Sequence, residues 1–393
     1  MAPGQETLRQ LESQANELKS KGDAAGALRA FEKAAKLDPS SGRIQDEIGF
    51  LLAVLKRNDE AKRYFQRAIE LEPNLALAHY HLGVAYWLDY DPSRSIPQLQ
   101  IAVELDPKTF DYRLYLGRAF NATSHFPDAL PQLQAATSLN TGHTEAWNQL
   151  GVARQNTGDS SGALEAYHRA VSLDPSNLDA RNNLGFMLVS TGRADEGIAQ
   201  FNKILETDPA NNMARINSGY AHLMKSELSQ AEVQFREVLR RTPALAIAHY
   251  DLGVTLKQKD DLDAAKVELQ RALELDPNLA EAHYTLGISY WQSGDFGAAA
   301  KELQAAVTLR PDYAEAYFML GTALKQKGDL DGAESALRSA ARRDPNNPGA
   351  YNTLGQVLRQ KGDIEGSRQA FAEGARVKEN KETALGKMLQ KKP

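Results

Sequence analysis

The residues best able to do chemistry in this sequence are its histidines and carboxylates, and their spacing suits neither catalysis nor metal binding. His79 and His81 are two residues apart, so on a helix their side chains point to different faces and cannot share a metal ion. The carboxylates are numerous but scattered at helix-surface spacing. The sequence lacks a phosphate-binding glycine loop, a dinucleotide fingerprint and a nucleophile elbow. We therefore expect a protein that is not an enzyme, with no catalytic residues, no metal and no cofactor.

The composition of the chain excludes several kinds of site and several classes of partner. The chain of 393 residues contains no cysteine, which excludes disulfides and thiolate metal sites. Its net charge of −5 is not the basic footprint of a nucleic-acid binder. No stretch approaches the roughly 20 apolar residues that span a bilayer, and residues 1–6 show no secretory pattern. We expect no nucleic acid, no membrane insertion and a cytoplasmic location, or a periplasmic one if a leader has been removed.

Glycine and proline recur along the chain with a single period. Both series keep a spacing of 34 residues, and the proline series omits one place, at Thr141. Two series in one register indicate tandem structural repeats rather than two or three ordinary domains. The glycines are Gly49, Gly83, Gly117, Gly151, Gly185, Gly219, Gly253, Gly287, Gly321 and Gly355, and the prolines are Pro39, Pro73, Pro107, Pro175, Pro209, Pro243, Pro277, Pro311 and Pro345.

Within each period, the residue types follow a helix–turn–helix pattern. One copy contains, in order, Leu286, Gly287, Tyr290, Gly294, Asp295, Ala299, Leu303, Ala306 and Pro311, and another contains Trp147, Leu150, Gly151, Ala163, Tyr167, Ala170 and Pro175. In these residues the sequence resembles the tetratricopeptide-repeat family. The resemblance covers nearly the whole chain and implies an all-α fold, a right-handed superhelical solenoid of antiparallel helix pairs.

The period divides the chain into eleven predicted repeats between a lead-in of residues 1–7 and a C-terminal capping helix with a basic tail at residues 382–393. The repeats are 8–41, 42–75, 76–109, 110–143, 144–177, 178–211, 212–245, 246–279, 280–313, 314–347 and 348–381. In the capping helix, Ala384, Leu385, Met388 and Leu389 recur at helical spacing.

Physical roles follow for the repeated residues. Gly287 lets the paired helix approach closely, and Gly294-Asp295 closes the inner turn, with glycine left-handed and aspartate as the next helix cap. The third and fourth repeats lack that turn and carry Pro97 and Pro131 inside their second helices. Because proline is tolerated only in a first turn, we expect these helices to start late or to bend, by sequence drift more than as a hinge.

The resemblance also implies that the first helix of each repeat lines a concave groove. The expected peptide-binding residues are Tyr80, Trp87, Tyr250, Lys257, Tyr284, Trp291, Phe318, Lys325 and Arg359. Aromatic and basic side chains together suit an extended peptide or a helix with apolar and acidic residues. The alternative is that the tyrosines only pack between repeats and the lysines are solvated loop ends. His79, His249 and His283 share one repeat position and are expected to pack rather than to bind.

The leading functional hypothesis is a non-catalytic scaffold that binds another protein in this groove, with self-association as a further option. The alternatives are a recruitment arm of a multi-chain enzyme or secretion complex, such as a glycosyltransferase, and, more distantly, RNA binding. Asn183 and Asn217 match the asparagine ladder of the O-linked N-acetylglucosaminyltransferase array, but the other repeats do not. The lysine, asparagine and arginine set by which co-chaperones clamp a C-terminal carboxylate is also incomplete.

Overall fold

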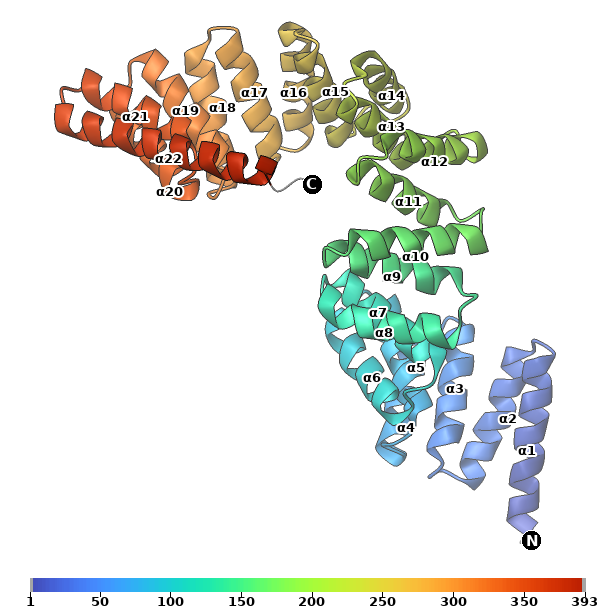
Figure 1. Cartoon of the computed structure of the whole chain (residues 1–393). Coiled ribbons are helices and arrows are strands. Elements are labelled where there is room, and N and C mark those ends of the chain that lie inside the picture. The colour runs from blue at the N-terminus through green and yellow to red at the C-terminus, as the bar shows by residue number, and fades with distance from the viewer. Residues whose placement is uncertain (1–2, 391–393) are drawn as a thin grey trace. The chain divides into compact units, whose positions relative to one another are not determined.

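The computed structural model describes residues 3–390, with side chains for residues 7–383. Within this range the chain forms 22 α-helices and no strand, which confirms the all-α solenoid expected from the sequence (Figure 1). The chain divides into two compact units, which we call unit 1 (Met1–Glu196) and unit 2 (Gly197–Pro393). The boundary between the two units falls within one helix, Ala194–Thr207.

The helices alternate between the first and the second helix of each repeat. The first helices are α1 (Pro3–Ser20), α3 (Gly42–Val54), α5 (Ala76–Leu88), α7 (Phe110–Ala122), α9 (Thr144–Asn156), α11 (Leu178–Ser190), α13 (Asn212–Met224), α15 (Ala246–Gln258), α17 (Ala280–Gln292), α19 (Ala314–Lys327) and α21 (Pro348–Gln360). The second helices are α2 (Ala24–Leu37), α4 (Asn58–Leu71), α6 (Pro92–Leu105), α8 (Phe126–Leu139), α10 (Ser160–Leu173), α12 (Ala194–Thr207), α14 (Leu228–Arg241), α16 (Leu262–Leu275), α18 (Phe296–Leu309), α20 (Leu330–Arg343) and α22 (Ile364–Gln390).

The core of each unit is built from contacts between neighbouring helices. Within unit 2, α17 packs against α18, α18 packs against α19, and the first helices α15 and α17 also touch. Small residues of the second helices, such as Ala299 and Ala306, are fully buried. Because each helix pair buries its apolar face against the next, stability is distributed along the stack.

The repeated glycines lie where the two helices of a repeat come closest. A Cβ atom on Gly151 would lie 2.4 Å from Cε1 of Tyr167, and one on Gly83 would lie 2.7 Å from Cγ of Leu99. The space that a side chain would need is therefore filled by a large residue of the second helix. The predicted role of the glycine series is confirmed.

The inner turn has one backbone conformation whether or not it contains glycine. Gly294 has φ +81°, and the side chain of Asp295 accepts a hydrogen bond from the N–H of Ala298. In the third and fourth repeats the same place is taken by Tyr90 and Ser124, with φ of 58° and 60°. A left-handed residue is thus required at this turn even where the sequence does not supply glycine.

The expected late start of the proline-containing helices is wrong. Both α6 and α8 begin at the same repeat position as α18 and have the same length. Pro92 and Pro127 lie in the first turns, where no backbone N–H is needed. Pro97 and Pro131 are exposed, so water can satisfy the carbonyl groups that they leave unbonded.

Side chains at one repeat position join the first helix of a repeat to its second helix and to the loop before the repeat. The imidazole of His283 lies 2.7 Å from Oε2 of Glu302 through Nδ1 and 3.2 Å from the carbonyl oxygen of Pro277 through Nε2. His249 makes the same two contacts with Glu268 and Pro243. These histidines are structural, as expected. An arginine at this position makes equivalent contacts: Arg215 donates hydrogen bonds to the side-chain oxygen of Gln234 and to the carbonyl oxygen of Pro209.

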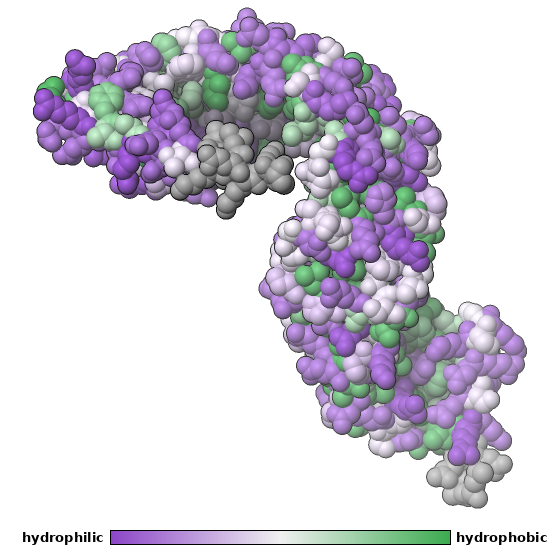
Figure 2. All heavy atoms as spheres, in the orientation of Figure 1, coloured by the Kyte–Doolittle hydropathy of each residue, from purple (hydrophilic) through white to green (hydrophobic). Residues whose placement is uncertain are grey.

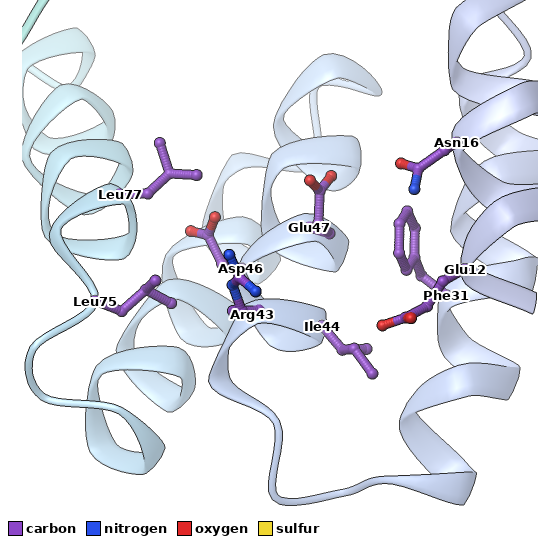
Figure 3. A pocket seen from close by; sticks show the side chains of 9 residues that line it. All are labelled: Glu12, Asn16, Phe31, Arg43, Ile44, Asp46, Glu47, Leu75 and Leu77. Carbon is purple, nitrogen blue, oxygen red and sulfur yellow. The ribbon is translucent and has the colours of Figure 1, made fainter. Parts of the chain in front are cut away.

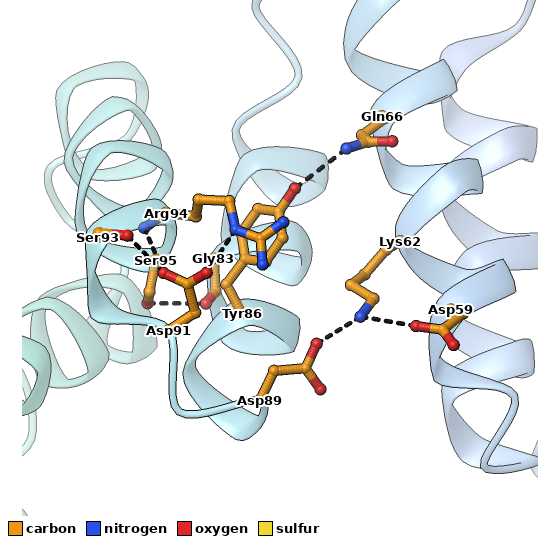
Figure 4. A network of polar contacts seen from close by, with 10 residues as sticks. All are labelled: Asp59, Lys62, Gln66, Gly83, Tyr86, Asp89, Asp91, Ser93, Arg94 and Ser95. Carbon is orange, nitrogen blue, oxygen red and sulfur yellow. Dashed lines mark hydrogen bonds and ion pairs between the residues drawn. The ribbon is translucent and has the colours of Figure 1, made fainter.

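A polar network ties the second repeat to the irregular third one (Figure 4). Lys62 on α4 pairs with Asp59, at 2.9 Å, and with Asp89 at the end of α5. Gln66 also reaches across, and its amide donates to the hydroxyl of Tyr86 at 3.1 Å. These contacts hold the turn of the third repeat in place although it lacks the usual Gly-Asp pair.

The two ends differ from the expected boundaries. Helix α1 begins at Pro3, inside the range predicted as a lead-in. Helix α22 runs without a break from Ile364 to Gln390, so residues 384–389 extend the last helix rather than form a separate one. Residues 391–393 of the expected basic tail lie outside the described residues.

Candidate binding surface

The first helices of unit 2 form a continuous row in which each helix touches the next: α13, α15, α17, α19 and α21. We call the exposed side of this row the first-helix face. Residues 34 positions apart in the sequence take equivalent places on successive helices. Seven of the nine predicted site residues lie on this row, while Tyr80 and Trp87 lie on α5 of unit 1.

The aromatic residues at one repeat position are both packed and accessible. Tyr250, Tyr284 and Phe318 are half-buried. The ring of Tyr284 lies 4.8 Å from that of Tyr313, centroid to centroid, and Phe318 packs against the core around Leu337 and Leu354. Burial raises the pKa of Tyr250 and of Tyr284. These rings therefore hold neighbouring repeats together and still offer part of their surface to a partner.

Two hydrogen-bond donors on neighbouring first helices have no partner among the residues that the structure describes. The ammonium group of Lys257 on α15 is half-buried, and burial lowers its pKa. The indole Nε1 of Trp291, at the equivalent place on α17, is buried without a hydrogen bond. Buried donors without partners are costly. Lys257 can meet an acceptor from another molecule as it stands, whereas Nε1 of Trp291 has to become exposed before it can donate to one.

The remaining basic residues of the predicted row differ from one another. Lys325 Nζ lies 2.5 Å from Oε1 of Gln356, a neutral partner, and Arg359 is exposed. Lys259 and Lys361, near the helix ends, are instead held in ion pairs with second-helix carboxylates, at 2.7 Å from Glu232 and 2.6 Å from Glu334. Lys257, Lys325 and Arg359 thus keep positive charge available, whereas Lys259 and Lys361 are structural.

Unit 1 carries a separate aromatic cluster. The ring of Tyr80 lies 4.8 Å from that of Tyr112 and 5.6 Å from that of Tyr115. The guanidinium of Arg118 lies over the rings of Tyr115 and Trp87, at 5.1 Å and 5.8 Å. Tyr80 is therefore mainly a packing residue, and Trp87 lines a small surface pocket beside Leu88 and Tyr90.

A pocket between α1, α3 and α5 in unit 1 is acidic but largely compensated (Figure 3). Its carboxylates are Glu12, Asp46 and Glu47. The ammonium of Lys19 lies 2.6 Å from Glu47, and His81 Nδ1 lies 2.9 Å from Asp46. Two of the three carboxylates already have partners, so the pocket by itself does not indicate a cationic ligand.

The asparagine expected to join a ladder is used within the protein. Asn183 donates to Oδ1 of Asn148 at 3.0 Å, and Asn121 donates to Oε1 of Gln149 at 2.9 Å. Both bonds join neighbouring first helices of unit 1. This arrangement stiffens the row rather than offering amide groups to a ligand.

Sequence reasoning missed three exposed apolar residues on the first-helix face of unit 2. Met213, Tyr220 and Met224 lie on α13 and are exposed, as is Ile247 on α15. Elsewhere, on the side of the molecule shown in Figure 2, hydrophobic residues are dispersed among hydrophilic ones, which is ordinary for a protein surface. These residues could have been found from the sequence by comparing equivalent positions from one repeat to the next.

Neither a membrane span nor a metal site is apparent in the part of the chain that the structure describes. No helix there is both long and apolar enough to cross a bilayer. Within the same residues, no three histidine, aspartate or glutamate side chains gather in a way that could hold a metal ion.

The stacked helix pairs and the exposed row of first helices define a helical-repeat protein of the class that binds partners along its stack. The chain belongs to the tetratricopeptide repeat family. The family model described as "Tetratricopeptide repeat" matches residues 91–144, 148–212, 284–348 and 319–380, and related models match residues 255–294 and 43–75. Proteins of this family are generally non-catalytic scaffolds that bind other proteins or peptides.

Two solved structures show the same fold at low sequence identity, and a third is similar to part of the chain. Yeast Tom70 is 14% identical, with 99% of this chain and 100% of that chain covered and a TM-score of 0.50. A tetratricopeptide repeat protein from Parabacteroides merdae is 15% identical, with 63% and 98% covered and a TM-score of 0.55. YrrB, described as a TPR protein with an unusual peptide-binding site, is 28% identical, with 43% and 88% covered and a TM-score of 0.39. No curated protein matches the sequence.

Proposed function

We propose that this protein is a non-catalytic scaffold that binds a segment of another protein on the first-helix face of unit 2. The contact residues are Tyr250, Lys257, Tyr284, Trp291, Phe318, Lys325 and Arg359, and Tyr80 and Trp87 supply a second surface in unit 1. The partner segment combines apolar and acidic side chains. We expect the scaffold to act in the cytoplasm.

The observation that carries this proposal is the pair of unpartnered donors, Lys257 and Trp291. The two side chains occupy equivalent places on helices that touch, and in the bound state the Trp291 side chain turns so that its Nε1 and the Lys257 ammonium meet one acceptor group. A carboxylate suits the site best, because it accepts from an ammonium and an indole N–H at once and carries the complementary charge. The half-exposed rings of Tyr250 and Tyr284 flank the pair and offer apolar contact to neighbouring side chains of the same segment.

The experiment is a peptide-array screen of the full chain against three proteins: the wild type, a Lys257→Met/Trp291→Phe variant, and a control variant. The test variant removes both donors and keeps similar shapes. The control, Lys327→Met/Trp147→Phe, changes an exposed lysine on the same unit and a tryptophan whose indole already donates to Thr141. We expect the wild type and the control to select peptides rich in aspartate or glutamate with apolar neighbours.

The test variant is expected to lose at least about tenfold in affinity for those peptides, which corresponds to about 1.4 kcal/mol. Equal binding by the wild type and the test variant would contradict the assignment of the site. Selection of basic peptides would contradict the proposed chemistry of the partner.

A further inference from the structure

The first-helix face of unit 2 changes character along its length, beginning with an apolar stripe on α13. Met213 and Met224 are 60% and 61% exposed, and Tyr220 is 39% exposed. The three residues are spaced by seven and by four positions, so they lie on one side of the helix. Exposed methionines on a single helix face form an adaptable apolar contact surface.

Equivalent positions on the following helices differ from this stripe. The place of Met213 is taken by Ile247, Glu281, Glu315 and Gly349, so the change toward positive charge concerns the C-terminal halves of the helices. The place of Tyr220 is taken successively by Val254, Ile288, Thr322 and Gln356. The place of Leu223 is taken by Lys257, Trp291, Lys325 and Arg359. The place of Met224 is taken by Gln258, Gln292, Gln326 and Gln360. The face therefore runs from apolar at α13 to polar and positively charged at α21.

We infer that this face binds its partner in one polarity, with an apolar block of an extended segment over α13 and a carboxylate block over α19 and α21. This inference rests on the proposed function and specifies its ligand. The positive charges of Lys325 and Arg359 are complementary to the carboxylates, and the exposed side chains of Tyr220 and Met224 accept the apolar block. Trp291 and Lys257 lie between the two ends.

The four equivalent glutamines explain why an extended backbone suits the face. They lie on successive helices, all are exposed, and no hydrogen bond joins their side chains to other described residues. Each amide offers both a donor and an acceptor, as the peptide backbone requires. Contacting helices are about 10 Å apart and an extended chain advances about 3.3 Å per residue, so each glutamine meets the segment about every third residue. The centres of the two blocks are then about eleven residues apart.

The test uses synthetic peptides of about 16 residues that span this distance. Two block peptides carry leucines at one end and glutamates at the other, in the two chain directions, because the direction of the bound chain is left open. A third peptide has the same composition with leucine and glutamate alternating. We expect one block peptide to bind the full chain about tenfold more tightly than the alternating peptide in a fluorescence anisotropy titration. Equal affinities for all three peptides would overturn the inference.

A second measurement locates the apolar block. Met224→Gln introduces the residue found at the equivalent place in the next four repeats, so the variant is expected to fold. Val233→Gln on α14 is the control, since Val233 is 62% exposed but lies on a second helix. We expect Met224→Gln to weaken the preferred block peptide by about threefold to tenfold, and Val233→Gln to leave binding unchanged.

The two proposals fail in different ways. If Lys257→Met/Trp291→Phe abolishes binding while Met224→Gln has no effect, the binding site stands and the polarity is wrong. If neither variant changes the binding of array-selected peptides, the site itself is wrong, and the inference about its polarity is lost with it.

Discussion

Cγ of Leu303 lies 2.7 Å from the point that a Cβ atom on Gly287 would occupy. Leu303 is fully buried on α18 and Gly287 is buried on α17, so the two helices meet at this point without space for a methyl group. The distance is below any normal contact between carbon atoms. Close approach of the two helices therefore depends on a hydrogen atom in place of a side chain at residue 287.

The first prediction concerns this glycine. Gly287→Leu, or the smaller change Gly287→Ala, forces α17 and α18 apart and is expected to lower the free energy of unfolding by about 1–3 kcal/mol. Thermal and urea denaturation followed by circular dichroism measure the effect. Gly297→Ala is the control, because the nearest atom to its added Cβ is 3.6 Å away. An unchanged melting curve for Gly287→Leu would show that the contact does not limit helix packing.

A second prediction concerns the hydrogen bonds of His283 to Glu302 and Pro277. The hydrogen bond that His283 donates to the carboxylate of Glu302 raises the pKa of His283, so the folded state holds the proton more tightly than the unfolded state. The added stability is complete below the unfolded pKa of about 6.5 and is lost as pH rises through the higher folded value. We expect the difference in melting temperature between the wild type and His283→Gln to be larger at pH 5.5 than at pH 8.5. His125→Gln, which replaces an exposed histidine at another position of the repeat, is the control in the same series.

A third prediction concerns the effect of the buried carboxyl of Asp251 on the pH dependence of stability. Burial raises the pKa of Asp251 to about 7, and no ion pair or hydrogen bond to its carboxyl occurs among the described residues. The folded state therefore holds a proton that the unfolded state releases, so stability falls as pH rises from about 4 to about 7. Asp251→Asn removes this loss and is expected to be more stable than the wild type by roughly 1–3 kcal/mol at pH 8, with little difference at pH 4. Asp312→Asn, on an exposed residue, is the matched control in the same denaturation series.

The turn of the third repeat supplies a fourth prediction. Tyr90 has φ 58° and is 93% exposed, so its ring gains little from packing while its backbone adopts a conformation unfavourable for a residue with a Cβ. Tyr90→Gly is expected to raise stability by about 0.5–1 kcal/mol. The reverse change, Gly294→Tyr at the equivalent turn, should lower it by a similar amount. A decrease in melting temperature for Tyr90→Gly would mean that the tyrosine ring makes a stabilising contact.

The fold was predictable from the sequence because each local environment recurs every 34 residues. Gly151 and Tyr167, or Gly294 and Asp295, are recognisable as a packing pair and a turn without knowledge of the rest of the chain. The proline-containing helices were misjudged, since the exposure of Pro97 decides whether the lost backbone hydrogen bond matters, and exposure depends on packing.

The candidate site was predictable only in part. Lys257 and Lys361 are both lysines near the end of a first helix, but Lys361 pairs with Glu334, 27 residues earlier, while Lys257 has no partner within the described residues. Whether a charge is available depends on side chains of the preceding repeat. The apolar stripe of Met213 and Met224 was missed for a different reason: its meaning appears only when one repeat is compared with the others at the same position.

The contact between Leu303 and Gly287 recurs at equivalent places, as between Leu337 and Gly321 or Leu269 and Gly253. Removal of one whole period from unit 2, such as residues 280–313, would therefore join two surfaces that already have the same shape. Duplication of a period would likewise add a helix pair with a ready partner on each side. Gene recombination can thus lengthen or shorten the row of first helices by whole repeats, and the reach of the surface across a partner can change during evolution without redesign of its core.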